Sequence, residues 1–171
     1  MTSAAKSNGL VCTLPVWDEA VAERAAGIRT CGSTSNTSIA LAAKCVLKQE
    51  RFDVGVASSL FGDILSDLAA ALTRSIGIAP SVNLDPTRQF PSMAEPVHGS
   101  GHDIAGRGIA NPIGAFWTAT LMFEHLGDAD AAGAVIAAIE PILADPATRT
   151  GDLQGRASTA EVTDALVAHL R

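Results

Sequence analysis

Two aspartates, Asp63 and Asp67, are the residues whose type and spacing most directly suggest chemistry. They belong to the segment LFGDILSD at residues 60–67, which follows a strand-like run. Residues four apart lie on one face of a helix, so the two carboxylates would repel each other unless a cation sat between them. Mg²⁺ or Mn²⁺ is a natural candidate, because hard cations prefer oxygen ligands. The alternative is a solvated helix face, which is the commoner case for such a pair taken alone.

A second group of candidates lies in a glycine-rich segment, EPVHGSGHDIAGRGIANP, at residues 95–112. Glycine has no side chain, so such a loop lets phosphate and ribose approach the backbone closely. The segment contains Asp103 and leads into a helix that we expect Asn111 to cap, with Pro112 at its first position. The first turn of a helix can meet an anion. The segment lacks the G-x-G-x-x-G pattern of a Rossmann fold, and glycine-rich loops are more often simple turns.

The elements that would position these residues follow from the hydrophobic pattern. Strands alternate with helices early in the chain and helices dominate later, which predicts an α/β fold. The stretch at residues 30–38, TCGSTSNTS, is rich in Ser and Thr and has no apolar periodicity. We expect strands at residues 11–16 and 52–57, an extended segment at 76–85, a loop-rich stretch at 89–108, helices at 17–26, 39–48, 60–73, 111–126 and 130–143, and a last helix that begins with a capping box at Ser158 and Glu161.

Composition and charge exclude several classes of function. The 171 residues are 47% hydrophobic and could form one domain or parts of two. A net charge of -6 argues against nucleic-acid binding, which needs a basic surface. No apolar run is long enough to cross a membrane, and the start of the chain does not resemble a signal peptide. The cysteines, Cys12, Cys31 and Cys45, lack the spacing of metal ligands and are expected to be reduced cytoplasmic thiols.

Together these segments resemble the metal-dependent decarboxylating dehydrogenases, the family of isocitrate, isopropylmalate and tartrate/D-malate dehydrogenases. The resemblance is nearest to the tartrate/D-malate branch, and it covers nearly the whole chain apart from residues 27–43. It implies the C-terminal half of an isopropylmalate-dehydrogenase-like fold, with an incomplete sheet flanked by helices. Residues 1–79 would be part of a small dimerisation and metal-site domain, and residues 80–171 part of a large cofactor-binding domain. The further matches are TSAAKSNG at 2–9, WDE at 17–19, SIGIAPSVNLDP at 75–86, FPSMAEPVHGS at 90–100 and DLQGRASTAEVTDAL at 152–166.

The resemblance implies a cytoplasmic homodimer that uses NAD and Mg²⁺ or Mn²⁺ to oxidise and decarboxylate a small 2-hydroxy acid such as tartrate or D-malate. Asp63 and Asp67 would bind the metal, which polarises the substrate. Lys6 would act on the proton of the substrate hydroxyl, and in the family this lysine comes from the partner subunit of the dimer. Asn8 would lie near the nicotinamide. Asp103 would accept a hydrogen bond from the ribose 2′-hydroxyl, which favours NAD over NADP because a carboxylate repels a 2′-phosphate. The other implied adenosine-site residues are His98, Gly99, Ser100 and Asn111.

The sequence also departs from the family pattern. The family is longer, and its N-terminal half supplies the arginines that clamp the substrate and a catalytic tyrosine, whereas this chain contains no tyrosine. A further metal-binding aspartate of the family falls at Ile39, or at Ser38 with a shifted gap. Ser59 stands where the family has asparagine, and Gly101-His102 where it has Ala-Pro.

These departures leave two hypotheses about function. The chain could retain the family activity in a homo-oligomer or with a partner that supplies the rest. It could instead be an inactive remnant that at most binds nucleotide or a partner chain, and we expect the chain alone to be inactive. The stretch at 30–38 has two explanations, a frame-shifted remnant of an aspartate-containing peptide or a natural Ser/Thr-rich loop. The nucleotide sequence of the gene distinguishes them.

Overall fold

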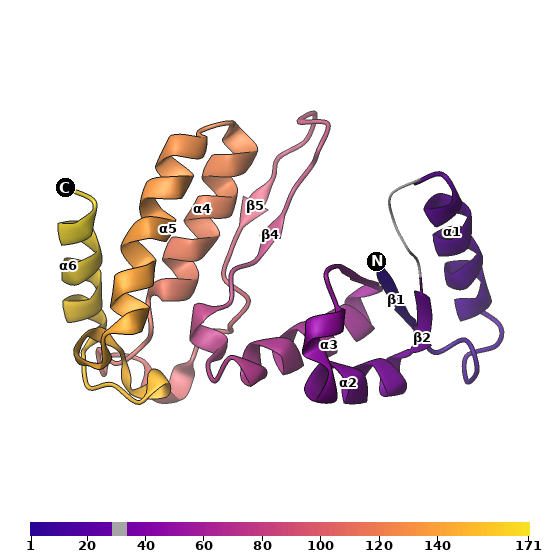
Figure 1. The fold of residues 1–171 in the computed structure, drawn as a ribbon, viewed down its shortest axis with the longest axis horizontal. Coiled ribbons are helices and arrows are strands. Elements are labelled where there is room, and N and C mark those ends of the chain that lie inside the picture. The colour runs from indigo at the N-terminus through magenta and orange to yellow at the C-terminus, as the bar shows by residue number, and fades with distance from the viewer. Residues whose placement is uncertain (29–33) are drawn as a thin grey trace. The chain divides into compact units, whose positions relative to one another are not determined.

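The computed structural model describes residues 1–28 and 34–171, which form two compact units, Met1–Leu72 and Thr73–Arg171 (Figure 1). Among these residues no helix combines the length and apolar character that a membrane span requires. The first unit is built on a small sheet, and the second on packed helices. The fold is therefore α/β, with an incomplete sheet flanked by helices.

The sheet of the first unit has three parallel strands in the order β2-β1-β3. They are β1 (Thr2–Ala5), β2 (Thr34–Thr37) and β3 (Gly55–Ala57). Ala4 pairs with Asn36 on one side and with Ala57 on the other. All four residues of the central strand are buried. Small side chains suit this position, because helices pack closely over it.

Three helices cover this sheet: α1 (Leu14–Ala26), α2 (Ser38–Leu47) and α3 (Ser59–Leu72), with a 3₁₀ turn, η1 (Gln49–Arg51), before β3. The connections β1-α1-β2 and β2-α2-β3 run in opposite directions across the sheet, so right-handed crossovers place α1 and α2 on opposite faces. In Figure 1, α1 lies on one side of the strands and α2 and α3 on the other. All three helices contact β1, which explains its complete burial.

The strand predicted at residues 11–16 is wrong. Residues 11–13 form a turn, and α1 begins at Leu14. Pro15 favours this start, because proline lacks the N–H that the first turn of a helix leaves unpaired. The strand of this region is β1, which the prediction missed since its TSAA sequence carries no large apolar residue. The early start also places Asp18 and Glu19 beyond the first turn of α1.

The predictions for the rest of the first unit are mostly confirmed. The helices expected at 39–48 and 60–73 are α2 and α3. The strand expected at 52–57 is shorter, because only Gly55–Ala57 pairs with β1, and Val54 is 58% exposed. β2 was not predicted, although its threonines suit a strand. Residues 30–33, the first part of the Ser/Thr-rich stretch and including Cys31, lie outside the described residues.

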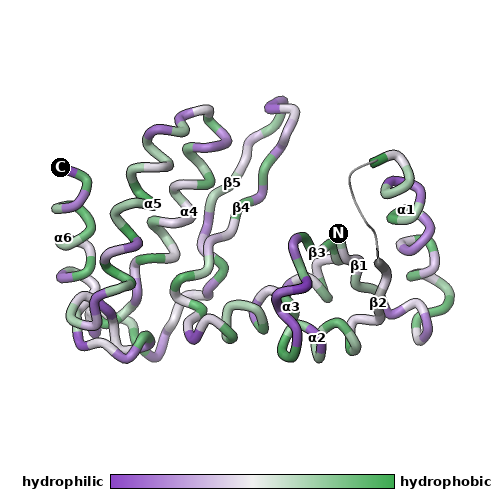
Figure 2. Tube along the Cα trace, viewed as in Figure 1, coloured by the Kyte–Doolittle hydropathy of each residue, from purple (hydrophilic) through white to green (hydrophobic). Residues whose placement is uncertain are grey.

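The second unit is dominated by α4 (Ile113–Leu126), α5 (Ala129–Ala144) and α6 (Thr159–His169). Figure 1 shows α4 and α5 side by side, and Figure 2 shows hydrophobic and hydrophilic stretches alternating along the helices, as expected when one face is buried. The apolar core forms where they meet. Its buried members are Ile113, Val135, Ala138, Ile139, Ile142, Val162 and Leu166.

The helix starts in this unit agree closely with the sequence. The capping box of α6 is confirmed, since the Ser158 Oγ accepts from the Glu161 N–H at 3.3 Å and Glu161 accepts from the Ser158 N–H at 2.7 Å. Asp128 caps α5 by accepting from the Ala131 N–H at 3.1 Å. α4 begins one residue later than expected, at Ile113, with Pro112 and not Asn111 at the N-cap position. The Asn111 Oδ1 still accepts a hydrogen bond from the Ile113 N–H at 3.0 Å, just before the helix.

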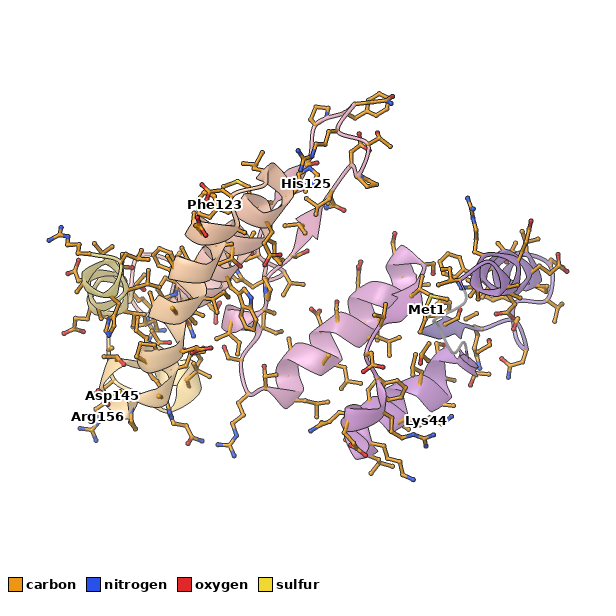
Figure 3. All side chains as sticks on the ribbon, turned by 45° about the horizontal axis from the view of Figure 1, so that its top comes forward. Met1, Lys44, Phe123, His125, Asp145 and Arg156 are labelled. Carbon is orange, nitrogen blue, oxygen red and sulfur yellow. The ribbon has the colours of Figure 1, made fainter. Side chains whose placement is uncertain are left out.

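A hairpin of β4 (Val82–Asn83) and β5 (Met93–Ala94) packs against α4. Its turn is organised by Asp85, whose carboxylate accepts hydrogen bonds from Thr87, Phe90 and Gln89. The side-chain bond from Thr87 contributes most, followed by the backbone bonds, and together they lower the pKa of Asp85 to about 2. Figure 3 labels His125 near the hairpin, where its Nε2 lies 3.3 Å from the Ser92 Oγ.

The connecting segments contain short 3₁₀ turns. The segment expected to be extended at 76–85 begins with η2 (Ile76–Ile78) before β4. The loop-rich stretch at 89–108 contains β5 and η3 (His102–Ile104). Between α5 and α6 the chain forms η4 (Pro146–Thr148) and η5 (Gly151–Leu153).

Candidate functional site

The carboxylate pair lies on α3, one helical turn apart. Asp63 and Asp67 are both exposed, so the helix presents two acidic groups on one face. Within residues 1–28 and 34–171, no group of three or more His, Cys, Asp or Glu side chains is arranged to hold a metal ion. The pair therefore supplies part of the ligand set that a hard cation needs, and the described residues do not complete it.

The position at which the family has a further aspartate lies at the start of α2. Ser38 is the first residue of this helix, and Ile39 is 66% exposed. Neither side chain carries a carboxylate. The start of α2 therefore offers no carboxylate at this position.

Lys6 follows β1 directly and sits in a tight turn. Its carbonyl accepts hydrogen bonds from the N–H groups of Gly9, at 2.9 Å, and Leu10, at 2.8 Å. Asn8 is exposed in the same turn. Because β1 and β3 are parallel and α3 follows β3, Lys6 and the start of α3 lie at the same, carboxyl-terminal edge of the sheet. The topology thus brings the predicted lysine and the acidic helix to one end of the sheet.

The glycine-rich loop of the second unit is largely exposed. Gly101, with φ of 55°, adopts the left-handed conformation that glycine tolerates best. Gly99 and Ser100 are exposed, as is Asp103 on η3. The Nδ1 of His98 lies 3.0 Å from the carbonyl oxygen of Gly99, so this side chain partners neighbouring backbone. The loop thus offers accessible backbone and one carboxylate to a ligand.

Asp152, on η5, accepts hydrogen bonds from the segment before η2 and from Asn111, just before α4. It was not among the predicted site residues. Its Oδ2 accepts a hydrogen bond from the Asn111 Nδ2 at 2.9 Å and another from the Ser75 hydroxyl. Its Oδ1 accepts from the Thr150 hydroxyl. Ser75 and Thr150 are 6% and 1% exposed. Of the predicted site residues, the network includes only Asn111.

The balance of burial and hydrogen bonding keeps Asp152 ionised. Burial is the largest single influence and raises the pKa of a carboxyl group. The hydrogen bonds from Ser75, Thr150 and Asn111 stabilise the charged form and together outweigh burial. The pKa of Asp152 is therefore lower than that of an ordinary aspartate.

Close packing of glycines holds this region together. A Cβ on Gly77 would lie 2.9 Å from the Cβ of Asn111, and a Cβ on Gly114 would lie 2.7 Å from the Gly77 carbonyl oxygen. The Ser75 Oγ also accepts from the Gly77 N–H at 2.9 Å. The turn η2 therefore fits against the first turn of α4 only because both glycines lack side chains.

Sequence reasoning missed Asp152, Ser75 and Thr150 for a simple reason. Ser75 and Asp152 lie inside segments that resemble the family, but the two residues are 77 positions apart in the chain. No periodicity or spacing connects them. The available signal was the presence of polar residues next to apolar ones in SIGIAP and TGDL, which does not identify a partner.

Comparison with known proteins places these features in a family. Residues 1–166 match the model of the isocitrate/isopropylmalate dehydrogenase family. A probable tartrate dehydrogenase/decarboxylase from Bacillus subtilis (strain 168) is 48% identical over 171 residues, which are 100% of this chain and 48% of the relative. The decarboxylating D-malate dehydrogenase of Escherichia coli (strain K12) is also 48% identical, over 97% of this chain and 47% of its own length.

Solved structures agree with the sequence relatives. The crystal structure of isocitrate dehydrogenase from Methylococcus capsulatus matches with a TM-score of 0.94 and 35% identity, over 99% of this chain and 50% of that one. The chain thus spans about half the length of the relatives it matches. On these grounds the chain belongs to the isocitrate/isopropylmalate dehydrogenase family.

Proposed function

We propose that this chain carries part of the metal and nucleotide sites of a dehydrogenase that oxidises and decarboxylates a small 2-hydroxy acid, such as tartrate or D-malate, with NAD and Mg²⁺ or Mn²⁺. The observation that carries the proposal is the pair of exposed carboxylates, Asp63 and Asp67, on one face of α3, within the part of the chain that matches the family. The relatives named for tartrate and D-malate support the choice of substrate.

In this proposal the first unit handles the reacting end of the substrate. Asp63 and Asp67 would hold the cation, and a divalent cation bound there would polarise the substrate hydroxyl and carboxylate. Lys6 would take the hydroxyl proton through its Nζ, and in a homodimer it would do so at the metal site of the partner copy. Asn8, exposed in the turn after β1, would lie near the nicotinamide.

The second unit would bind the adenosine half of NAD, and the nicotinamide of the same cofactor would accept the hydride. His98, Gly99 and Ser100 provide an accessible loop, and Asn111 presents its amide at the start of α4. Asp103 would accept a hydrogen bond from the ribose 2′-hydroxyl. An exposed carboxylate at this position repels a 2′-phosphate, which makes NAD the preferred cofactor.

A homodimer accounts for the apolar surface of the first unit. Ile39 and Leu47 on α2 are 66% and 78% exposed, and Leu60 and Ile64 on α3 are 64% and 57% exposed. Apolar side chains gathered on adjacent helices are typical of an interface. A second copy covering them would also bring further groups toward Asp63 and Asp67. A cytoplasmic location fits the free thiols of Cys12 and Cys45.

A second candidate function is binding without turnover, in which the chain holds nucleotide or a partner chain but catalyses nothing. The incomplete ligand set of Asp63 and Asp67 among the described residues favours it. Loss of one carboxylate from a hard-metal site weakens cation binding, and the reaction depends on the cation.

The deciding experiment measures NAD⁺ reduction by the purified chain with tartrate and with D-malate, in the presence and absence of Mn²⁺. Metal-dependent turnover that falls about a hundredfold or more in Lys6→Met supports the dehydrogenase. The matched control is Lys44→Met, on α2, which should leave the rate unchanged. Binding of Mn²⁺ and ADP-ribose without turnover supports the second function. A folded chain that binds neither contradicts both.

A further inference from the structure

The hydrogen-bond network around Asp152 bears on how the nucleotide base is selected. We propose that Asp152 is a positioning residue that locks the side-chain amide of Asn111 in one orientation and so makes the site selective for adenine over hypoxanthine. This inference rests on the proposed function, which places Asn111 in the adenosine site. Beyond that function, the orientation of the Asn111 amide explains why adenine would be preferred over hypoxanthine.

Two neighbours with opposite hydrogen-bonding character set the orientation of the amide. The ionised Asp152 carboxylate can only accept, so it must face the Nδ2 of Asn111, 2.9 Å away. The backbone N–H of Ile113 can only donate, so it must face the Oδ1, at 3.0 Å. A flipped amide would place oxygen against the carboxylate and nitrogen against the N–H. Both hydrogen bonds would be lost, so one orientation is selected.

The locked amide keeps half of its hydrogen-bonding capacity for a ligand. An asparagine side chain has two N–H donors and an oxygen with two lone pairs, and the network uses one of each. One donor and one acceptor remain. Adenine presents an adjacent acceptor and donor, and asparagine pairs with such an edge through two hydrogen bonds. Hypoxanthine presents N1–H and O6, the reverse pattern, which only a flipped amide would match.

The remaining contacts of Asp152 make the lock rigid. The hydroxyls of Ser75 and Thr150 donate to the same carboxylate, and both side chains are buried. The Ser75 Oγ is itself held by the Gly77 N–H. The missing side chain of Gly77 leaves the space that the Asn111 Cβ occupies. Asp152 therefore cannot move away from Asn111 without breaking contacts to two buried residues.

The test uses calorimetric titration of the full chain with ADP-ribose and with its hypoxanthine counterpart, inosine diphosphate ribose. Wild type should bind ADP-ribose about tenfold or more tightly than the hypoxanthine analogue. Asp152→Ala should weaken ADP-ribose binding about tenfold and reduce the preference between the bases. Asp152→Asn, which keeps one acceptor for Asn111 but can itself rotate, should be intermediate. Asp164→Ala, at an exposed carboxylate on α6, serves as the matched control and should bind as wild type does.

A double-mutant cycle separates positioning from general structural support. If Asp152 acts through Asn111, Asp152→Ala should have little further effect on base preference in an Asn111→Ala background. Additive effects of the two substitutions on base preference, or an unchanged base preference in Asp152→Ala, would overturn the inference. Neither result would contradict the proposed adenosine site. A wild-type chain that binds neither nucleotide would overturn the adenosine site itself, and the inference with it.

Discussion

The two units hold their candidate residues in different ways. In Met1–Leu72, Asp63 and Asp67 are exposed on α3, and their four-residue spacing along the helix is enough to bring them to one face. In Thr73–Arg171, Asn111 is held by hydrogen bonds to Asp152 and to the Ile113 N–H. The arrangement in the second unit depends on a buried hydrogen-bond network, whereas the arrangement in the first unit does not. The site in the second unit should therefore respond far more strongly to changes in packing.

The difference teaches where each site is vulnerable. A pair on one helix face survives small distortions, because helix geometry sets its spacing. A network assembled from residues near 75, 111 and 150 requires the whole unit to be folded. Changes that unfold the second unit should therefore abolish nucleotide binding and leave cation binding by the first unit intact.

The largest effect is expected from Gly155→Ala, because the new Cβ would lie 1.9 Å from the Arg149 carbonyl oxygen. Relief of that clash must move the loop that carries Asp152, so we expect the second unit to lose roughly 3 kcal/mol of stability or more. Urea denaturation measures the loss, and ADP-ribose binding should fall while Mn²⁺ binding is retained. Gly133→Ala on α5 is the control, since its Cβ meets nothing within 4 Å, and it should stabilise the helix by about 1 kcal/mol. Equal stability of the two variants would contradict the packing described for the loop.

A core truncation tests whether the units unfold separately. Leu166 is 0% exposed in the core of the second unit, so Leu166→Ala should cost that unit about 3 kcal/mol. Leu41, 4% exposed in the first unit, provides the matched truncation. Hydrogen exchange followed by mass spectrometry should show each variant losing protection only in its own unit. Loss across both units in either variant would show that they unfold together.

A smaller effect is expected at the carboxylate pair. Asp63→Asn removes one of the two charges on the face of α3 and should lower Mn²⁺ affinity about tenfold, as measured by calorimetric titration. Asp53→Asn, an exposed aspartate before β3, is the control and should leave the affinity unchanged. The stability of the second unit should not respond to either change. Unchanged affinity in Asp63→Asn would remove this residue from the site.

The smallest effect concerns the pH dependence of the β4-β5 hairpin. The pKa of Asp85 falls from 3.8 to about 2 on folding, so its stabilising contribution is present above pH 3.8 and is lost as the pH falls through 2. Carboxyl-carbon NMR should show a titration midpoint near 2 for Asp85. Asp85→Asn should remove the corresponding pH dependence of amide exchange in the hairpin, whereas Asp145→Asn should not. A midpoint near 3.8 would show that the turn does not hold the carboxylate as described.

Several elements could be predicted because their signals are local. The helices α2, α3, α5 and α6 follow from apolar periodicity. The capping box at Ser158 and Glu161 needs only residues three apart, and it is present. The strand β1 was missed because its small residues carry no strong β signal, and their burial depends on helices that pack over them. β2 was missed because polar residues form a strand there through pairing with β1.

The sequence alone determined the spacing of Asp63 and Asp67, the glycine-rich loop and the family to which the chain belongs, because each depends on residues close together in the chain or on long matching segments. Tertiary structure decided that Lys6 and the start of α3 share one edge of the sheet, since that follows from strand order. It also decided that Ser75, Thr150 and Asn111 converge on Asp152. Hydrogen bonds between segments so far apart form only when the helices between them pack, and no local pattern in the chain records that packing.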